Sequence, residues 1–193
     1  ARSLDVAVGR VQLGRILLKQ GRLAAADSMF GVGMVRLTKI YDPSHPVRVR
    51  TYHHTGMLRL RQGRLEEARR LFEVSMQRAK TSMPTRHPFR AYPMLGLGRV
   101  YMKMGEPATA KPILREAAAL RKKAFGAGNG LVAVVQGQLG RCLQQQGQYE
   151  AAESLLKTAE ATLRKRPAGD SSLQQVQRAL VTLYEAWGRS EQA

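Results

Sequence analysis

Four histidines and one cysteine are the side chains of this 193-residue chain that could hold a metal ion or pair a nucleophile with a base. His53 and His54 are adjacent on a predicted helix, so their side chains point in different directions. His45 and His87 stand 42 residues apart, and each precedes a proline, which indicates equivalent structural roles. Cys142 lies among apolar positions and is predicted to be a small packing residue. The sequence therefore predicts no metal site, no catalytic residue and no cofactor, and it does not indicate an enzyme.

Charge is the unusual part of the composition. The chain has 32 Lys and Arg against 14 Asp and Glu, a net charge of +18. A chain this basic attracts acidic partners, whether peptide, nucleic acid or anionic membrane surface. A lone cysteine excludes an intrachain disulfide and favours a reducing, cytoplasmic location. No apolar run is long enough to span a membrane, so we expect no membrane partner.

A sequence unit recurs along the whole chain. Seven residues before the repeated glycine stands another glycine in the first four copies, and five residues after it stands an alanine in every copy. Apolar residues recur at helical spacing on both sides, which predicts two helices in each unit with the glycine at the turn between them. The marking glycines, spaced 42, 42, 42 and 41 residues apart, are Gly21, Gly63, Gly105, Gly147 and Gly188.

The start of each first helix is also visible. Eighteen residues before the marking glycine stand His45, His87, Asn129 and Asp170. Asn and Asp are strong N-caps, and the two histidines precede proline, which is favoured at the first helical position. The first helix of a unit should therefore run from about Pro46 to Gln62. Because strand signals are absent, the predicted fold is all-α, a solenoid of antiparallel helix pairs.

The pattern L-G-x-x-x-L/Y before the glycine, with alanine and then an aromatic or leucine after it, resembles the tetratricopeptide repeat. The 42-residue period is similar to the long variant found in kinesin light chains and many bacterial proteins, and the closing residues resemble the last repeats of bacterial multidomain signalling proteins. The resemblance implies a right-handed superhelical array, and we expect a segment of a longer protein. The predicted repeats are 3–44, 45–86, 87–128, 129–169 and a truncated 170–193.

Basic residues gather on one face of the predicted first helices. In the first four copies these helices contain one acidic residue, Asp5, whereas most other acidic residues fall on the second helices. The resemblance implies that first helices line a concave groove. Arginine suits such a site because its planar fork pairs with carboxylate or phosphate through two hydrogen bonds. The predicted groove residues, which we expect to be exposed, are Arg15, Lys19, Arg50, His53, His54, Arg61, Tyr92, Arg99, Lys103 and Arg141.

The leading interpretation is a non-catalytic protein-interaction or scaffold module whose basic groove binds an acidic peptide or partner domain. Kinesin light chain repeats usually hold the peptide backbone with asparagines of the first helix. This chain has none there except the cap Asn129, so that binding mode is not transferred. RNA binding through the same cations is the second interpretation, although the groove offers few aromatics for base stacking. A spacer or oligomerisation segment, or a basic face that is only solvated, remains open.

Three local expectations complete the sequence-based prediction. Pro112 lies inside a second helix, where it should cause a bend or a late helix start, and Pro93 should disturb the first helix of the same repeat. The last helix, which carries Tyr184 and Trp187, should expose an apolar face because terminal repeats need capping.

Overall fold

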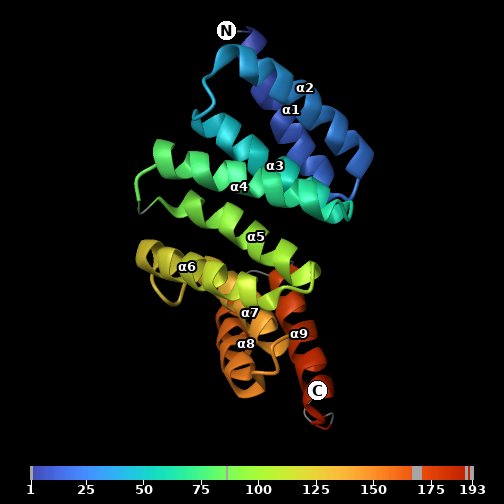
Figure 1. Ribbon diagram of the computed structural model, residues 1–193, viewed down its shortest axis with the longest axis vertical. Coiled ribbons are helices and arrows are strands. Elements are labelled where there is room, and N and C mark those ends of the chain that lie inside the picture. Colours follow the sequence, from blue (N-terminus) through green and yellow to red (C-terminus); the bar gives the residue numbers. More distant parts are fainter. Residues whose placement is uncertain (1, 86, 167–170, 190, 192–193) are drawn as a thin grey trace. The chain divides into compact units, whose positions relative to one another are not determined.

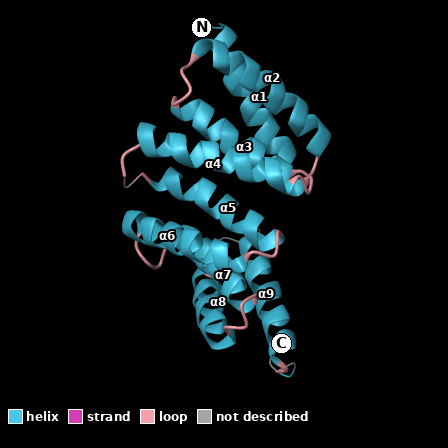
Figure 2. Cartoon of the chain, viewed as in Figure 1, coloured by secondary structure: helices cyan, strands magenta, loops and turns pink. Residues whose placement is uncertain are grey.

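The structure, a computed structural model, describes residues 2–85, 87–166, 171–189 and 191, with the backbone alone for residues 2–4. These residues form nine α-helices and one short 3-10 helix, and no strand occurs among them (Figures 1 and 2). The predicted all-α class is therefore confirmed. The chain divides into two compact units, which cover residues 1–100 and 101–193.

The first unit consists of helix pairs. Helix α1 packs against α2, and α3 packs against α4, while α3 also contacts both helices of the first pair. Figure 1 shows that the two helices of each pair run in opposite directions. The last three residues of α5 belong to the second unit. The helices are α1 (Arg2–Lys19), α2 (Leu23–Ile40), α3 (Pro46–Arg61), α4 (Leu65–Ser82), the 3-10 helix η1 (Pro88–Arg90) and α5 (Ala91–Lys103).

The second unit repeats this arrangement. Helices α7 and α8 form the antiparallel pair, α6 packs on α7, and α9 contacts both members of the pair. First helices thus contact one another in each unit, as α1 contacts α3 and α7 contacts α9. The helices are α6 (Pro107–Phe125), α7 (Gly130–Gln144), α8 (Tyr149–Leu163) and α9 (Ser171–Trp187).

The marking glycines form the turns, as predicted. All five have φ between 71° and 80°, in the left-handed region that other residues enter only at a cost. At Gly21 the turn is closed by two backbone hydrogen bonds, from Gly21 N to the Leu18 carbonyl (3.1 Å) and from Arg22 N to the Leu17 carbonyl (3.0 Å). This is the Schellman pattern of a glycine-terminated helix.

The predicted helix caps are confirmed where the structure describes them. His45 Nδ1 accepts a hydrogen bond from Val47 N at 3.3 Å, and His87 Nδ1 accepts one from Phe89 N at 3.2 Å. Asn129 Oδ1 accepts one from Leu131 N at 2.8 Å. Each cap satisfies a backbone N–H that has no partner within its helix. The fourth predicted cap, Asp170, lies outside the described residues.

Small residues let the helices of a pair approach closely. A Cβ atom added to Gly14 would lie 2.8 Å from the Phe30 ring, and one added to Gly140 would lie 2.7 Å from Leu156. Both contacts are too short for a real methyl group, so glycine is required by packing at these positions.

One apolar column shows how neighbouring helix pairs stack. The residue five positions before the marking glycine is fully buried at Leu58, Val100, Cys142 and Leu183. The same position in α1 is Ile16, which is 49% exposed. Among the described residues no helix packs against that face of α1, which explains the difference.

The two prolines behave differently. At Pro93 the prediction is confirmed, since the helix opens with the 3-10 turn η1 and α5 has 13 residues against 16 in α3. At Pro112 the predicted late start is wrong, because α6 begins at Pro107 and continues without interruption to Phe125. Pro112 is exposed and removes only the one backbone hydrogen bond that its N–H would make, so the rest of α6 sustains the helix.

The predicted apolar exposure of the last helix is wrong for both aromatics. Tyr184 is 5% exposed, and its hydroxyl donates to Glu153 Oε1 on α8 at 2.7 Å. Trp187 is half-buried and stacks on Tyr149, with ring centroids 5.7 Å apart. Helix α8 supplies the partners that the sequence pattern of α9 alone does not reveal.

Candidate ligand-binding surface

Several acidic residues of the second helices form ion pairs. Glu66 and Glu73 both pair with Arg69 on α4, and Glu160 pairs with Arg164 next to the end of α8. Asp27 on α2 pairs with Arg59 on α3, which is one of the contacts between the first two helix pairs. Each of these carboxylates is therefore paired with an arginine.

The first helices carry cations without such partners. Arg15 on α1 and Arg50 on α3 are exposed, and no ion pair joins either to a carboxylate of the described residues. Both side chains line one hollow of about 50 Å³ together with His54. The remaining lining residues are Val8, Val11, Gln12 and Val47.

The pKa of His54 is affected by burial and by the positive charges around this hollow. Burial lowers its pKa to about 4, and the nearby positive charges of Arg15, Arg50 and Lys19 act in the same direction. The imidazole is therefore neutral near pH 7 and stacks on Phe30, with ring centroids 6.3 Å apart. An anion placed in the hollow would meet fixed positive charge and no competing carboxylate.

Three further predicted cations lie at the C-terminal ends of first helices. Lys19, Arg61 and Lys103 are exposed and end their helices α1, α3 and α5. Arg61 also donates a hydrogen bond to the backbone carbonyl of Leu18, which brings it next to Lys19. Cations at helix C-termini are favoured by the helix dipole, so part of this basic character serves the helices themselves.

Four predicted groove residues, His53, His54, Tyr92 and Arg99, are not exposed, so the expectation is wrong for them. His53 is 7% exposed, and its ring lies 5.6 Å from Phe72 and 5.7 Å from Tyr92 between centroids. Tyr92 is half-buried and stacks on Phe89 at 5.4 Å. Arg99 is also half-buried. His53 and Tyr92 are therefore packed among aromatic rings, which include Phe72 of α4 and Phe89 of η1.

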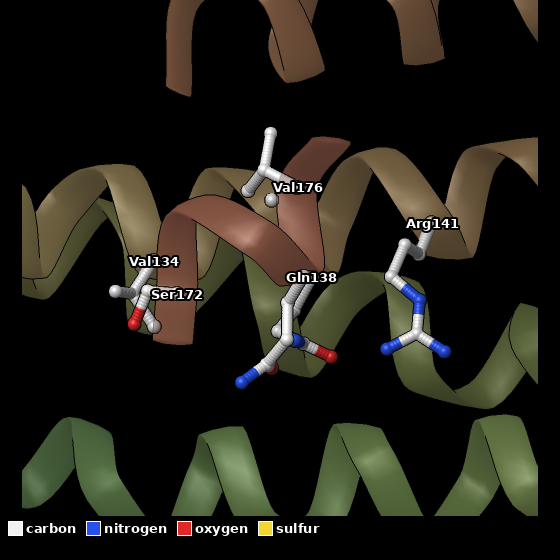
Figure 3. Close-up of a pocket in the computed structure, with 7 residues that line it drawn as sticks. Val134, Gln138, Arg141, Ser172 and Val176 are labelled. Carbon is white, nitrogen blue, oxygen red and sulfur yellow. The ribbon is translucent and has the colours of Figure 1, made fainter. Parts of the chain in front are cut away.

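Arg141, like Lys103, is a predicted cation of the second unit, and it is exposed on α7. It borders a small hollow with Gln138 of the same helix and Gln175 of α9. Figure 3 shows Gln138 and Arg141 projecting to the same side. A second, open hollow shares Arg141 and Gln175 and adds Arg178. Sequence reasoning missed Gln138, Gln175 and Arg178, although extending the groove positions into the fifth copy would have found Gln175 and Arg178.

Cys142 is a packing residue, as predicted. It is fully buried, and its thiol donates a hydrogen bond to the Pro107 carbonyl at 3.2 Å. Burial raises the pKa of the thiol, which disfavours the reactive thiolate. Among the described residues no three His, Cys, Asp or Glu side chains gather as metal ligands.

No helix of the described chain is both long and apolar enough to cross a membrane. The geometry instead defines a class, a repeat protein built from antiparallel helix pairs with glycine turns. The tetratricopeptide repeat family matches residues 5–81 and 90–165. The chain belongs to this family, whose fold generally mediates protein–protein interaction and whose members are typically non-enzymatic scaffolds.

Solved structures share the fold. A kinesin light chain-like protein of Podosopora anserina with nearly identical TPR-like repeats has 22% identity and a TM-score of 0.75, over 95% of this chain and 87% of that one. BtubC (BKLC) of P. vanneervenii has 20% identity and a TM-score of 0.75, over 94% and 72% of the two chains. MamA of AMB-1 has 23% identity and a TM-score of 0.54, over 95% and 90%. No curated protein sequence matches this chain.

Proposed function

We propose that this protein is a non-catalytic interaction module whose first-helix surface binds an acidic peptide or an acidic segment of a partner domain. One observation carries the proposal: Arg15, Arg50 and His54 line the same hollow, with Lys19 close enough to act on His54. Within the described part of the chain no ion pair joins Arg15 or Arg50 to a carboxylate. A cationic hollow beside apolar valines suits a peptide carboxylate and its aliphatic stem.

The distribution of charge supports ligand binding over a basic face that is only solvated. Arg69 has two carboxylate partners on its own helix. Arg15 and Arg50 have none among the described residues, although the chain contains acidic residues that could have been placed beside them. Cations concentrated without counter-charges raise the local potential, which attracts anions and speeds their association. A cytoplasmic, reducing location is part of the proposal, because Cys142 is a free thiol.

Fluorescence anisotropy with a labelled, end-blocked hexaglutamate peptide tests the proposal. The double variant Arg15→Glu/Arg141→Glu should lose binding, because attraction becomes repulsion. The matched control is Arg70→Glu/Arg115→Glu, which makes the same change in net charge at exposed positions of the second helices α4 and α6. Equal loss in both variants would show diffuse attraction and reject a specific surface.

The same experiment separates the other interpretations. Single-stranded oligouridine uses the same cations through phosphate, and its affinity should fall steeply with rising salt because bound counterions are released. If oligouridine binds and hexaglutamate does not, the ligand is nucleic acid. If neither binds, the chain is a spacer or an oligomerisation segment and the proposal fails.

A further inference from the structure

The two units contain hollows built from equivalent repeat positions. In α1 the tetrapeptide Gln12-Leu13-Gly14-Arg15 contributes its Gln and Arg to the hollow of the first unit. In α7 the identical tetrapeptide Gln138-Leu139-Gly140-Arg141 contributes its Gln and Arg to the hollow of the second. A valine one turn earlier, Val8 or Val134, lines each hollow.

The next first helix completes each hollow at equivalent positions. In the first unit α3 supplies Val47 and Arg50. In the second unit α9 supplies Ser172 and Gln175, which stand 16 and 13 residues before their marking glycine, as Val47 and Arg50 do. The second cation of the second unit comes instead from Arg178, one turn further along α9. Gln12, Arg15 and Arg50 thus line one hollow in the first unit, whereas in the second unit Gln138, Arg141 and Arg178 are divided between two hollows that share Arg141.

The environment of Gln138 indicates that a ligand binds beside it. It is 5% exposed, yet its Oε1 has no hydrogen-bond partner in the described structure. A buried acceptor without a partner is costly, and the small hollow beside it, about 10 Å³, holds roughly one water-sized group. The adjoining open hollow, about 240 Å³, is bordered by Arg141, Arg178 and Thr182. A backbone N–H of a ligand would satisfy Gln138 while the side-chain carboxylate of the same residue, whose carbon is three bonds from that nitrogen in Asp and four in Glu, reaches the arginines.

We propose that each unit binds its own acidic peptide segment, so that one chain offers two separate acidic-peptide subsites. The first-unit subsite is Gln12, Arg15, Arg50 and His54, and the second-unit subsite is Gln138, Arg141, Gln175 and Arg178. The inference rests on the proposed function, and it adds the number of sites and the residues of each. In the second subsite Gln138 accepts a hydrogen bond from the ligand backbone, and the two arginines bind its carboxylate.

Isothermal titration of the full chain with end-blocked hexaglutamate tests the number of sites. We expect two peptides per chain, one per chain for Arg15→Glu/Arg50→Glu, and one per chain for Arg141→Glu/Arg178→Glu. The control Arg70→Glu/Arg115→Glu should keep two. One peptide per wild-type chain, abolished by either subsite pair, would overturn the separate subsites while leaving the acidic-ligand function intact. No binding by the wild type would defeat the proposed function itself.

The role of Gln138 is tested in the background that leaves only the second subsite, Arg15→Glu/Arg50→Glu. Adding Gln138→Met keeps a similar shape and removes the unsatisfied acceptor. We expect Tm to stay the same or rise, and the affinity for hexaglutamate to fall about tenfold, the loss expected for one hydrogen bond. An unchanged affinity would remove Gln138 from the subsite. A lowered Tm would show that its oxygen serves the fold.

Discussion

The guanidinium of Arg59 on α3 donates two hydrogen bonds to the carboxylate of Asp27 on α2, from Nη1 to Oδ2 at 2.6 Å and from Nη2 to Oδ1 at 2.9 Å. The Arg59 side chain is only 15% exposed, so this pair between two helix pairs is better shielded than a surface ion pair. The hydrogen bond from Arg59 lowers the pKa of Asp27.

We expect Asp27→Ala to lower the free energy of unfolding by about 1–3 kcal/mol, because Arg59 then keeps a partly buried charge with one fewer partner. Urea denaturation measures this loss, and Glu66→Gln, in an exposed pair, should cost less than about 0.5 kcal/mol. Because the folded pKa is lowered, the contribution of Asp27 is present above pH 4 and disappears as the pH falls further. Equal losses in the two variants would contradict this account.

Gly96 shows how tightly the first unit is packed. A Cβ atom at this position would lie 2.5 Å from two atoms of the Phe72 ring. Gly96→Ala should therefore destabilise the protein by about 1–3 kcal/mol, the cost of overpacking a core. Gly9 on α1 has no atom within 4 Å of its added Cβ, so Gly9→Ala should stabilise the helix by about 0.5–1 kcal/mol. Thermal melts of both variants check the opposite signs, and a destabilising Gly9→Ala would refute the packing argument.

His54 should make stability depend on pH. Arg15 and Lys19 of α1 and Arg50 of its own helix act on it, and Phe30 of α2 stacks on it. Its folded pKa, about 4, lies below the unfolded value of about 6.5, so the unfolded state binds the extra proton between these values. Stability is then full above about pH 6.5 and falls toward pH 4, by at most about 3 kcal/mol. His54→Gln should flatten this part of the pH–stability profile, and an unchanged profile would assign the slope to other groups.

The column of Ile16 and Leu58 predicts unequal effects of similar substitutions. Leu58 is fully buried in the core of the first helix pair, so Leu58→Ala should cost about 2–5 kcal/mol. Ile16 is 49% exposed at the equivalent position, and Ile16→Ala should change stability by less than about 1 kcal/mol. Chemical denaturation of the two variants decides this, and similar losses would mean that the outer face of α1 is covered in solution.

Local signals in the sequence predicted the local structure well. The turn at Gly21 needs a positive φ, and the cap at His45 needs an acceptor beside the first N–H groups, and both requirements concern only neighbouring residues. The assignment of the family followed from the same local pattern at a fixed period.

The burial of some side chains and the position of the hollow at Gln138 depend on contacts with other helices, which the local sequence pattern does not predict. The sequence analysis predicts His53 on the exposed face, but its repeat equivalents Val11, Leu95 and Gly137 are apolar or small, and in the fold it packs against Phe72. Tyr184 is buried because Glu153 on another helix accepts its hydroxyl hydrogen bond. The hollow at Gln138 depends on how α9 crosses α7, which no residue of α7 encodes by itself.

The caps at the helix starts have a consequence for the tautomers of two imidazoles. In the first unit, α3 and the turn η1 are each begun by an imidazole nitrogen that accepts a backbone hydrogen bond. Because Nδ1 is the acceptor in both rings, the proton of each ring lies on Nε2. Asn129, which begins α7 in the second unit, accepts through an amide oxygen instead. Nitrogen-15 NMR of the ring nitrogens would identify the tautomers of His45 and His87 directly, and a proton on Nδ1 of either ring would contradict its cap.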